Sequence, residues 1–79
     1  MSAIHEKLTH LLVTQLGVPA GKVEAGISYK DLGLDSLALI ELTMIINKEL
    51  GTDLGDDLLQ GETTIAETVE LIEAQGVPA

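Results

Sequence analysis

The sequence has no cysteine, phenylalanine, tryptophan or arginine, and Tyr29 is its only aromatic residue. The absence of cysteine excludes a disulfide, a cysteine-ligated zinc ion and a thiol nucleophile. Without other aromatic side chains, the core has to be built from leucine, isoleucine and valine, which suits helices that meet along aliphatic stripes. The length of 79 residues is that of one small domain, which we expect to span residues 1–79.

Positive charge is also scarce, since four lysines stand against 13 acidic residues and the net charge is −9. Such a chain is repelled by nucleic acid and anionic membranes, and it is attracted by basic patches on other proteins. Residues 1–16 carry polar side chains at helical spacing, so we expect neither a secretory signal nor a membrane span. We therefore expect a soluble, cytoplasmic protein and a monomer.

Signals for catalysis or metal binding are weak. Ser36 has no histidine close in sequence and no Gly-x-Ser-x-Gly motif, which argues against a hydrolase nucleophile. His5 and His10 are about 140° apart around a helix axis, so we expect two exposed histidines rather than a metal site. The acidic residues at 53–57 lack the spacing of a calcium loop. The sequence thus predicts no catalytic residues and no metal.

Apolar periodicity and end signals predict a first helix that starts after Ser2 and stops at Gly17. Its buried face consists of Ile4, Leu8, Leu11, Leu12 and Leu16. No helical period persists through residues 17–35, which form a long loop, and a long loop in so small a domain is often functional.

A second helix is predicted from about Ser36 to Leu50, and a capping box of Thr64 and Glu67 marks the start of the last one. Between these two helices, the segment 56–60 is expected to form a short turn or a single helical turn.

The most informative stretch is Leu32-Gly33-Leu34-Asp35-Ser36-Leu37, where the long loop becomes the second helix. Gly33 allows the backbone to turn, and Asp35 is suited to cap the helix. Ser36 is then on the first helical turn, where the helix dipole favours a phosphate ester. This placement indicates a site of covalent attachment more than a catalytic site.

The second helix carries two apolar strips. One, within roughly 60° of Leu39 on a helical wheel, consists of Leu39, Leu42, Ile46 and Leu50. The other, at roughly 100–160°, consists of Leu37, Ile40 and Met44, with Glu41 beside it. Either the helix is buried on two sides, or the second strip is an exposed face that binds a partner. Because Ser36 lies at the end of the second strip, its location favours a binding face.

These residues resemble the acyl carrier protein family. The resemblance rests on the Asp-Ser-Leu motif with its preceding Leu-Gly, on the helix register after it, and on the acidic balance. It extends from about residue 8 to residue 71 and includes Leu16-Gly17-Val18, Val23, Asp31 and Thr63-Thr64-Ile65.

The resemblance implies a four-helix bundle with a short third helix and a long loop between helices one and two. It also implies that Ser36, with Asp35 as its motif neighbour, carries 4′-phosphopantetheine derived from coenzyme A, whose thiol holds an acyl group as a thioester. The docking residues that it implies on the second helix are Leu37, Ile40, Glu41 and Met44. The implied partners are a phosphopantetheinyl transferase, acyl-loading enzymes such as an acyltransferase or ligase, and ketosynthase-type enzymes.

The sequence departs from the family of fatty-acid carriers at Ala38, Asn47 and Lys48, where acids are common. The departures favour a discrete carrier of polyketide, antibiotic or other specialised biosynthesis over primary fatty-acid biosynthesis. A discrete aminoacyl or peptidyl carrier with the same arm is an alternative, although Leu34 replaces the second glycine of that group's motif. A different class of alternative is an unmodified helical module that binds a partner without a covalent arm.

Overall fold

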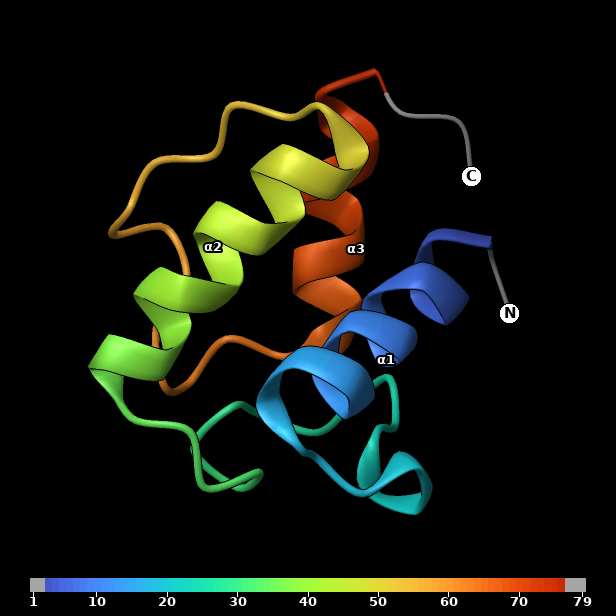
Figure 1. Cartoon of the computed structure of the whole chain (residues 1–79), viewed down its shortest axis with the longest axis vertical. Helices are drawn as coiled ribbons and strands as arrows, with labels where there is room; N and C mark the ends of the chain where they lie inside the picture. The colour runs from blue at the N-terminus through green and yellow to red at the C-terminus, as the bar shows by residue number, and fades with distance from the viewer. Residues whose placement is uncertain (1–2, 77–79) are drawn as a thin grey trace.

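The computed structural model describes residues 3–76 and contains three α-helices (Figure 1). Helix α1 spans Ala3–Leu16, α2 spans Ser36–Leu50 and α3 spans Ile65–Ala74, while a short 3₁₀ helix, η1, covers Ala20–Lys22. Within the described residues, pairing of extended backbone is limited to one isolated bridge between Ser28 and Thr64. The predicted all-helical class is therefore confirmed.

The segment 56–60 forms a turn, the first of the two conformations expected for it, so the short third helix of a four-helix bundle is not formed. The turn includes a hydrogen bond from the Leu58 N–H to the Gly55 carbonyl at 3.2 Å. A stretch this short gains too few helical hydrogen bonds to offset the cost of nucleation, and glycines at 55 and 61 flank it.

Helix α1 buries the predicted apolar face and ends where the sequence predicts. Ile4, Leu8, Leu11 and Leu12 are buried and Leu16 is half-buried. Gly17 adopts a left-handed conformation with φ of 71°, and the Val18 N–H then reaches back to the Leu12 carbonyl at 3.1 Å. The predicted cap Ser2 lies outside the described residues. His10 is exposed as expected, but the expectation for His5 is wrong because this side chain is buried within the bundle.

The core is centred on α1, which packs against both α2 and α3 (Figure 1). No Cα atom of α2 lies within 8 Å of a Cα atom of α3, so these two helices meet only through side chains. The fully buried aliphatic residues come from all three helices: Ile4, Leu8 and Leu12 from α1, Leu42 and Ile46 from α2, and Ile65 and Ile72 from α3.

The long loop between α1 and α2 is ordered by hydrogen bonds to the start of α3. The first two N–H groups of α3, which have no acceptor within the helix, donate to this loop: Ile65 to the Ile27 carbonyl at 3.0 Å and Ala66 to the Ala25 carbonyl at 2.9 Å. The Tyr29 N–H in turn donates to the Thr63 carbonyl at 3.1 Å. The loop therefore has a fixed position relative to α3 and delivers the chain to α2 at one place.

Tyr29 is the side chain that joins this loop to the core. It is fully buried, and its hydroxyl lies 2.6 Å from Oγ1 of Thr68 on α3. Thr68 donates its own proton to the Thr64 carbonyl at 3.1 Å, so the Tyr29 hydroxyl is the donor in the pair. Burial raises the pKa of Tyr29 to about 12, although the Thr68 hydroxyl, which can turn toward a phenolate, acts in the opposite direction.

Helix α2 has a well-defined cap at each end. At its start, the Asp35 carboxylate accepts a hydrogen bond from the Ala38 N–H at 2.8 Å. At its end, Gly51 adopts a left-handed conformation with φ of 70°, and its N–H donates to the Asn47 carbonyl. The helix bounds agree with those predicted from the sequence.

Replacing Thr68 with valine should destabilise the fold by about 1–3 kcal/mol, because the Tyr29 hydroxyl would stay buried without its acceptor. Valine keeps the shape of threonine, so the loss reflects the hydrogen bond rather than a cavity. Urea denaturation followed by far-ultraviolet circular dichroism measures the change.

The matched control for Thr68→Val is Tyr29→Phe, which removes the hydroxyl itself and should cost only about 0.5–1.5 kcal/mol. The double variant should lose less stability than the two single losses added together, since the same hydrogen bond is counted in both. Strict additivity would show that the Tyr29–Thr68 hydrogen bond contributes nothing.

Replacing Asp35 with alanine should cost about 1 kcal/mol of stability through loss of the α2 cap. Asp35→Asn is the control: asparagine caps a helix about as well as aspartate, so its free energy of unfolding should stay close to that of the original chain. Urea titration measures the free energy of unfolding of both variants. Equal losses of stability in the two would show that Asp35 contributes through its charge and not through capping.

Candidate functional site

Ser36 is an exposed residue at the first position of α2. The start of this helix lies at the edge of the molecule in Figure 1. The chain reaches it through Gly33, which has φ of 78°, a backbone conformation that side chains disfavour. Asp35 and Leu37 on either side are exposed as well. The hydroxyl of Ser36 is therefore presented to solvent from a rigid helix end rather than from a mobile loop.

The electrostatics at Ser36 suit a phosphate ester. The first turn of a helix presents N–H groups and the positive end of the helix dipole. The Asp35 carboxylate takes up one of these N–H groups, that of Ala38, and leaves the hydroxyl of Ser36 accessible. An exposed serine hydroxyl fits a phosphodiester-linked arm that extends into solvent, and it does not fit a buried nucleophile.

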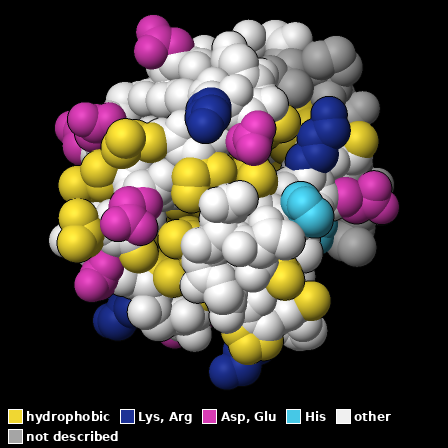
Figure 2. Space-filling view, in the orientation of Figure 1, with side chains coloured by type: hydrophobic (Ala, Val, Ile, Leu, Met, Phe, Trp, Pro, Cys, Tyr) yellow, Lys and Arg dark blue, Asp and Glu magenta, His cyan; other side chains and the backbone are white. Residues whose placement is uncertain are grey.

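The second apolar strip of α2 is exposed. Leu37 is 63% exposed, Ile40 39% and Met44 61%, whereas the first strip supplies core residues, with Leu39, Leu42 and Ile46 buried and Leu50 half-buried. The alternative of a helix buried on two sides is therefore wrong. Glu41 is exposed beside the strip. Figure 2 shows hydrophobic and acidic side chains alternating over the region occupied by α2.

All the residues predicted for attachment and docking are exposed and lie at the start of α2 or along the helix as far as Met44. They are Asp35, Ser36, Leu37, Ile40, Glu41 and Met44. We call Leu37, Ile40 and Met44 the docking strip. At a rise of about 1.5 Å per residue, Met44 lies roughly 12 Å along the helix from Ser36.

The side chain of Asn47 is hydrogen-bonded to the chain that follows α2, so the interpretation of Asn47 as a change in surface charge is wrong. Its side chain amide donates to the Leu54 carbonyl at 3.0 Å, and its oxygen accepts from the Leu54 N–H at 2.8 Å and the Thr52 hydroxyl at 2.7 Å. A carboxylate could not make the first of these bonds. Asn47 therefore orders the chain that leaves α2, and only Ala38 and Lys48 remain as departures relevant to docking.

Leu58, in the turn between α2 and α3, was not predicted as a surface residue of interest, although it is 41% exposed. Its neighbour Leu59 is buried, and the sequence has no signal that distinguishes the two. Only the fold determines which of these adjacent leucines points outward.

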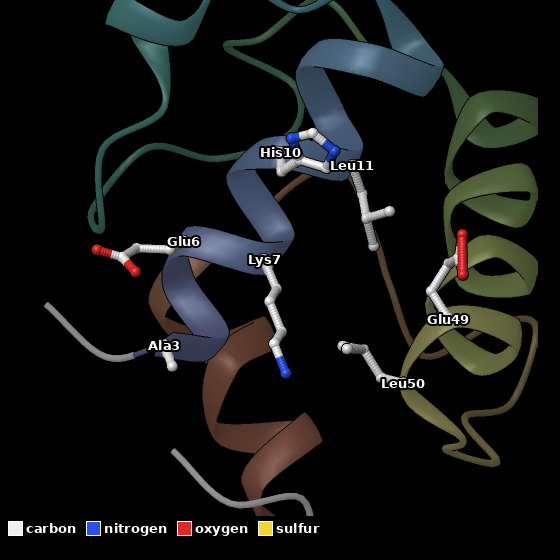
Figure 3. A pocket seen from close by; sticks show the side chains of 7 residues that line it. All are labelled: Ala3, Glu6, Lys7, His10, Leu11, Glu49 and Leu50. Atoms are coloured by element: carbon white, nitrogen blue, oxygen red, sulfur yellow. The ribbon is translucent and has the colours of Figure 1, made fainter.

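A groove of about 450 Å³ between α1 and the end of α2 is separate from this face (Figure 3). Its lining consists of Ala3, Glu6, Lys7, His10, Leu11, Glu49 and Leu50. None of the residues predicted for the site lines it. In Figure 3 the side chain of Glu6 points away from those of Lys7 and Glu49, so the ionisable groups do not converge on one point.

Residues 3–76 also lack two features that would indicate other kinds of site. No group of three or more histidine, aspartate or glutamate side chains in this range is arranged to hold a metal ion. Likewise, none of the helices described is long and apolar enough to cross a membrane.

Comparison with known proteins identifies the family. Residues 6–72 match the family described as "Phosphopantetheine attachment site". The chain is 39% identical over 74 residues to the acyl carrier protein of Sinorhizobium fredii, a match covering 92% of this chain and 95% of that protein. The same identity and coverage are found with the acyl carrier protein AcpP of Rhizobium meliloti.

The match to the attachment family covers all of α2 and most of α1 and α3. The alignment with the relatives extends over nearly their whole length. The exposed serine on the first turn of α2 fits the arm of that family. The chain therefore belongs to the acyl carrier protein family, whose members are non-catalytic carriers that receive a 4′-phosphopantetheine group from a phosphopantetheinyl transferase.

Proposed function

We propose that Ser36 is the attachment point of the arm, and that the chain holds acyl intermediates on it and delivers them to biosynthetic enzymes. The observation that carries this proposal is the exposure of Ser36 at the capped start of α2, next to an exposed apolar strip. When bound, the arm supplies a thiol that holds the acyl group as a thioester.

Attachment requires only an accessible hydroxyl from this chain. The Ser36 oxygen would attack the β-phosphorus of coenzyme A, forming a phosphodiester while the pyrophosphate bond breaks and adenosine 3′,5′-bisphosphate leaves. The transferase accepts the serine proton, since the residues next to Ser36 offer no histidine. Asp35 holds the helix start rigid through its bond to Ala38, which keeps the hydroxyl in one position for the transferase.

Docking is assigned to the strip and to Glu41. Three exposed apolar side chains within about two helical turns offer a partner area to bury. Glu41 adds a negative charge beside them, and the net charge of −9 favours encounter with basic surfaces. Because the strip starts at Ser36, an enzyme that binds it has the attachment point within reach.

The pathway is part of the proposal. On α2, the half-buried Ala38 and the exposed Lys48 lie where fatty-acid carriers often have acids, so the helix is less acidic. This favours partners selected by a different charge pattern, as in polyketide, antibiotic or other specialised biosynthesis, over primary fatty-acid synthesis. We also propose that residues 1–79 act as one cytoplasmic, monomeric carrier domain.

The attachment site is tested by incubating the chain with coenzyme A and a broad-specificity phosphopantetheinyl transferase. Intact-mass analysis should show one added phosphopantetheine group, because Ser36 is the one exposed serine at a helix start within residues 3–76. The addition should be absent in Ser36→Ala and retained in Ser28→Ala, the control for another serine in the described chain. Failure to modify the chain while a control carrier is modified would favour the unmodified interaction module.

The docking assignment predicts that Glu41→Lys lowers kcat/KM for transferase loading by about five- to tenfold, mainly through KM, since a charge next to the strip is reversed. Glu6→Lys on α1 changes the net charge equally and should load at nearly the original rate. Both variants should keep their helical circular dichroism. Equal rates for the two would mean that Glu41 contributes only to overall charge.

A further inference from the structure

A second surface groove lies between α3 and the turn that precedes it. Its volume is about 460 Å³, and its lining consists of Leu58, Thr63, Glu67, Glu70, Leu71 and Ala74. Leu58, 41% exposed, lies on one side, and Leu71 and Ala74 lie on the other. The groove therefore combines an apolar surface with two carboxylates of α3.

The charge around this groove is predominantly negative. The sequence from residue 49 onward has no basic side chain and contains eight acidic residues: Glu49, Asp53, Asp56, Asp57, Glu62, Glu67, Glu70 and Glu73. Lys30 of the long loop lies nearby, since its N–H donates to the Gly61 carbonyl at 2.8 Å, two residues before the groove-lining Thr63. The acidic side chains outnumber it, so the groove has a negative potential.

The two carboxylates that line the groove differ in availability. Glu67 is engaged in the capping box of α3, where its Oε1 accepts from the Thr64 N–H at 2.9 Å. Glu70, one turn further along, is exposed beside Leu71. A cationic side chain in the groove would therefore pair with Glu70, and an apolar side chain would contact Leu58.

We propose that this groove is a second docking site, which binds a basic amphipathic segment of a partner protein. A leucine-like side chain of that segment would contact Leu58 and Leu71, and a lysine or arginine would pair with Glu70. A second copy of this chain does not fit, because each copy carries a net charge of −9 and repels the other. The same charge disfavours nucleic acid and anionic lipid.

This site does not depend on the arm or on the docking strip, because none of the residues that form the strip lines the groove. It gives the protein a contact with partners that is separate from Ser36. A partner could hold the carrier through α3 while the face around Ser36 stays free for a catalytic domain, which raises the local concentration of the carrier at that domain.

The test uses the unmodified, isotopically labelled chain and a synthetic helical peptide of leucine and lysine, about four turns long, with leucine along one face. Amide chemical shifts followed by NMR at physiological ionic strength should change in the segments 58–63 and 67–74, as a group separate from any shifts along the docking strip of α2. A peptide with glutamate in place of each lysine should cause no change. Shifts confined to α2, or spread evenly over the acidic residues, would overturn the proposal.

Variants identify the contacts. Glu70→Lys and Leu58→Ser should each weaken binding of the basic peptide by about five- to tenfold, since one reverses the charge and the other removes the apolar contact. Glu6→Lys on α1 matches Glu70→Lys in net charge and should bind within about twofold of the original chain. If Glu6→Lys weakens binding as much as Glu70→Lys, the affinity for the peptide depends only on the net charge of the chain, and the groove is not a binding site.

Discussion

The position of the functional face depends on the attachment of the long loop to α3. Two N–H groups of α3 that lack helical acceptors donate to carbonyls of this loop, and the buried Tyr29 hydroxyl donates to Thr68 in the same helix. These bonds satisfy groups that would otherwise be costly to bury. Because the loop ends at Asp35, the same bonds determine where α2 begins and where Ser36 is presented.

The exposure of the docking strip follows from the arrangement of the helices around α1. Since α1 packs on both other helices, α2 needs only one buried face to complete the core. Its remaining apolar side chains are left in contact with solvent, at a cost that a partner can recover by covering them. The proposed docking role would use this exposure, because a carrier that delivers its cargo has to be recognised by other proteins.

The helices and their ends were predictable because their signals are local. The capping box of Thr64 and Glu67, the left-handed glycines at 17 and 51, and the period of the apolar residues need only neighbouring sequence. The exposed face around Ser36 was predictable in composition, since the wheel separates its residues from the core. Whether the other helices cover that strip depends on how they pack against α2, which a helical wheel of α2 alone does not show.

Other features were not predictable because they depend on contacts distant in sequence. The burial of His5 and the outward orientation of Leu58 depend on how the elements pack against one another. The bond between Tyr29 and Thr68, which are 39 positions apart, forms only when the loop and α3 come together. The partners of Asn47 could not be found from the sequence of α2, because they lie in the chain that follows the helix. Its three bonds to residues 52–54 depend on the path of that chain, which has no regular secondary structure.

The separation of α2 from α3 has a mechanical consequence. The two helices share a core but no close backbone approach, so a small rotation of α2 about its contact with α1 would shear side chains past one another without breaking a helical hydrogen bond. Aliphatic side chains tolerate such sliding better than polar pairs do, because their attraction is not directional. Such a rotation would carry the start of α2, and Ser36 with it, relative to α3.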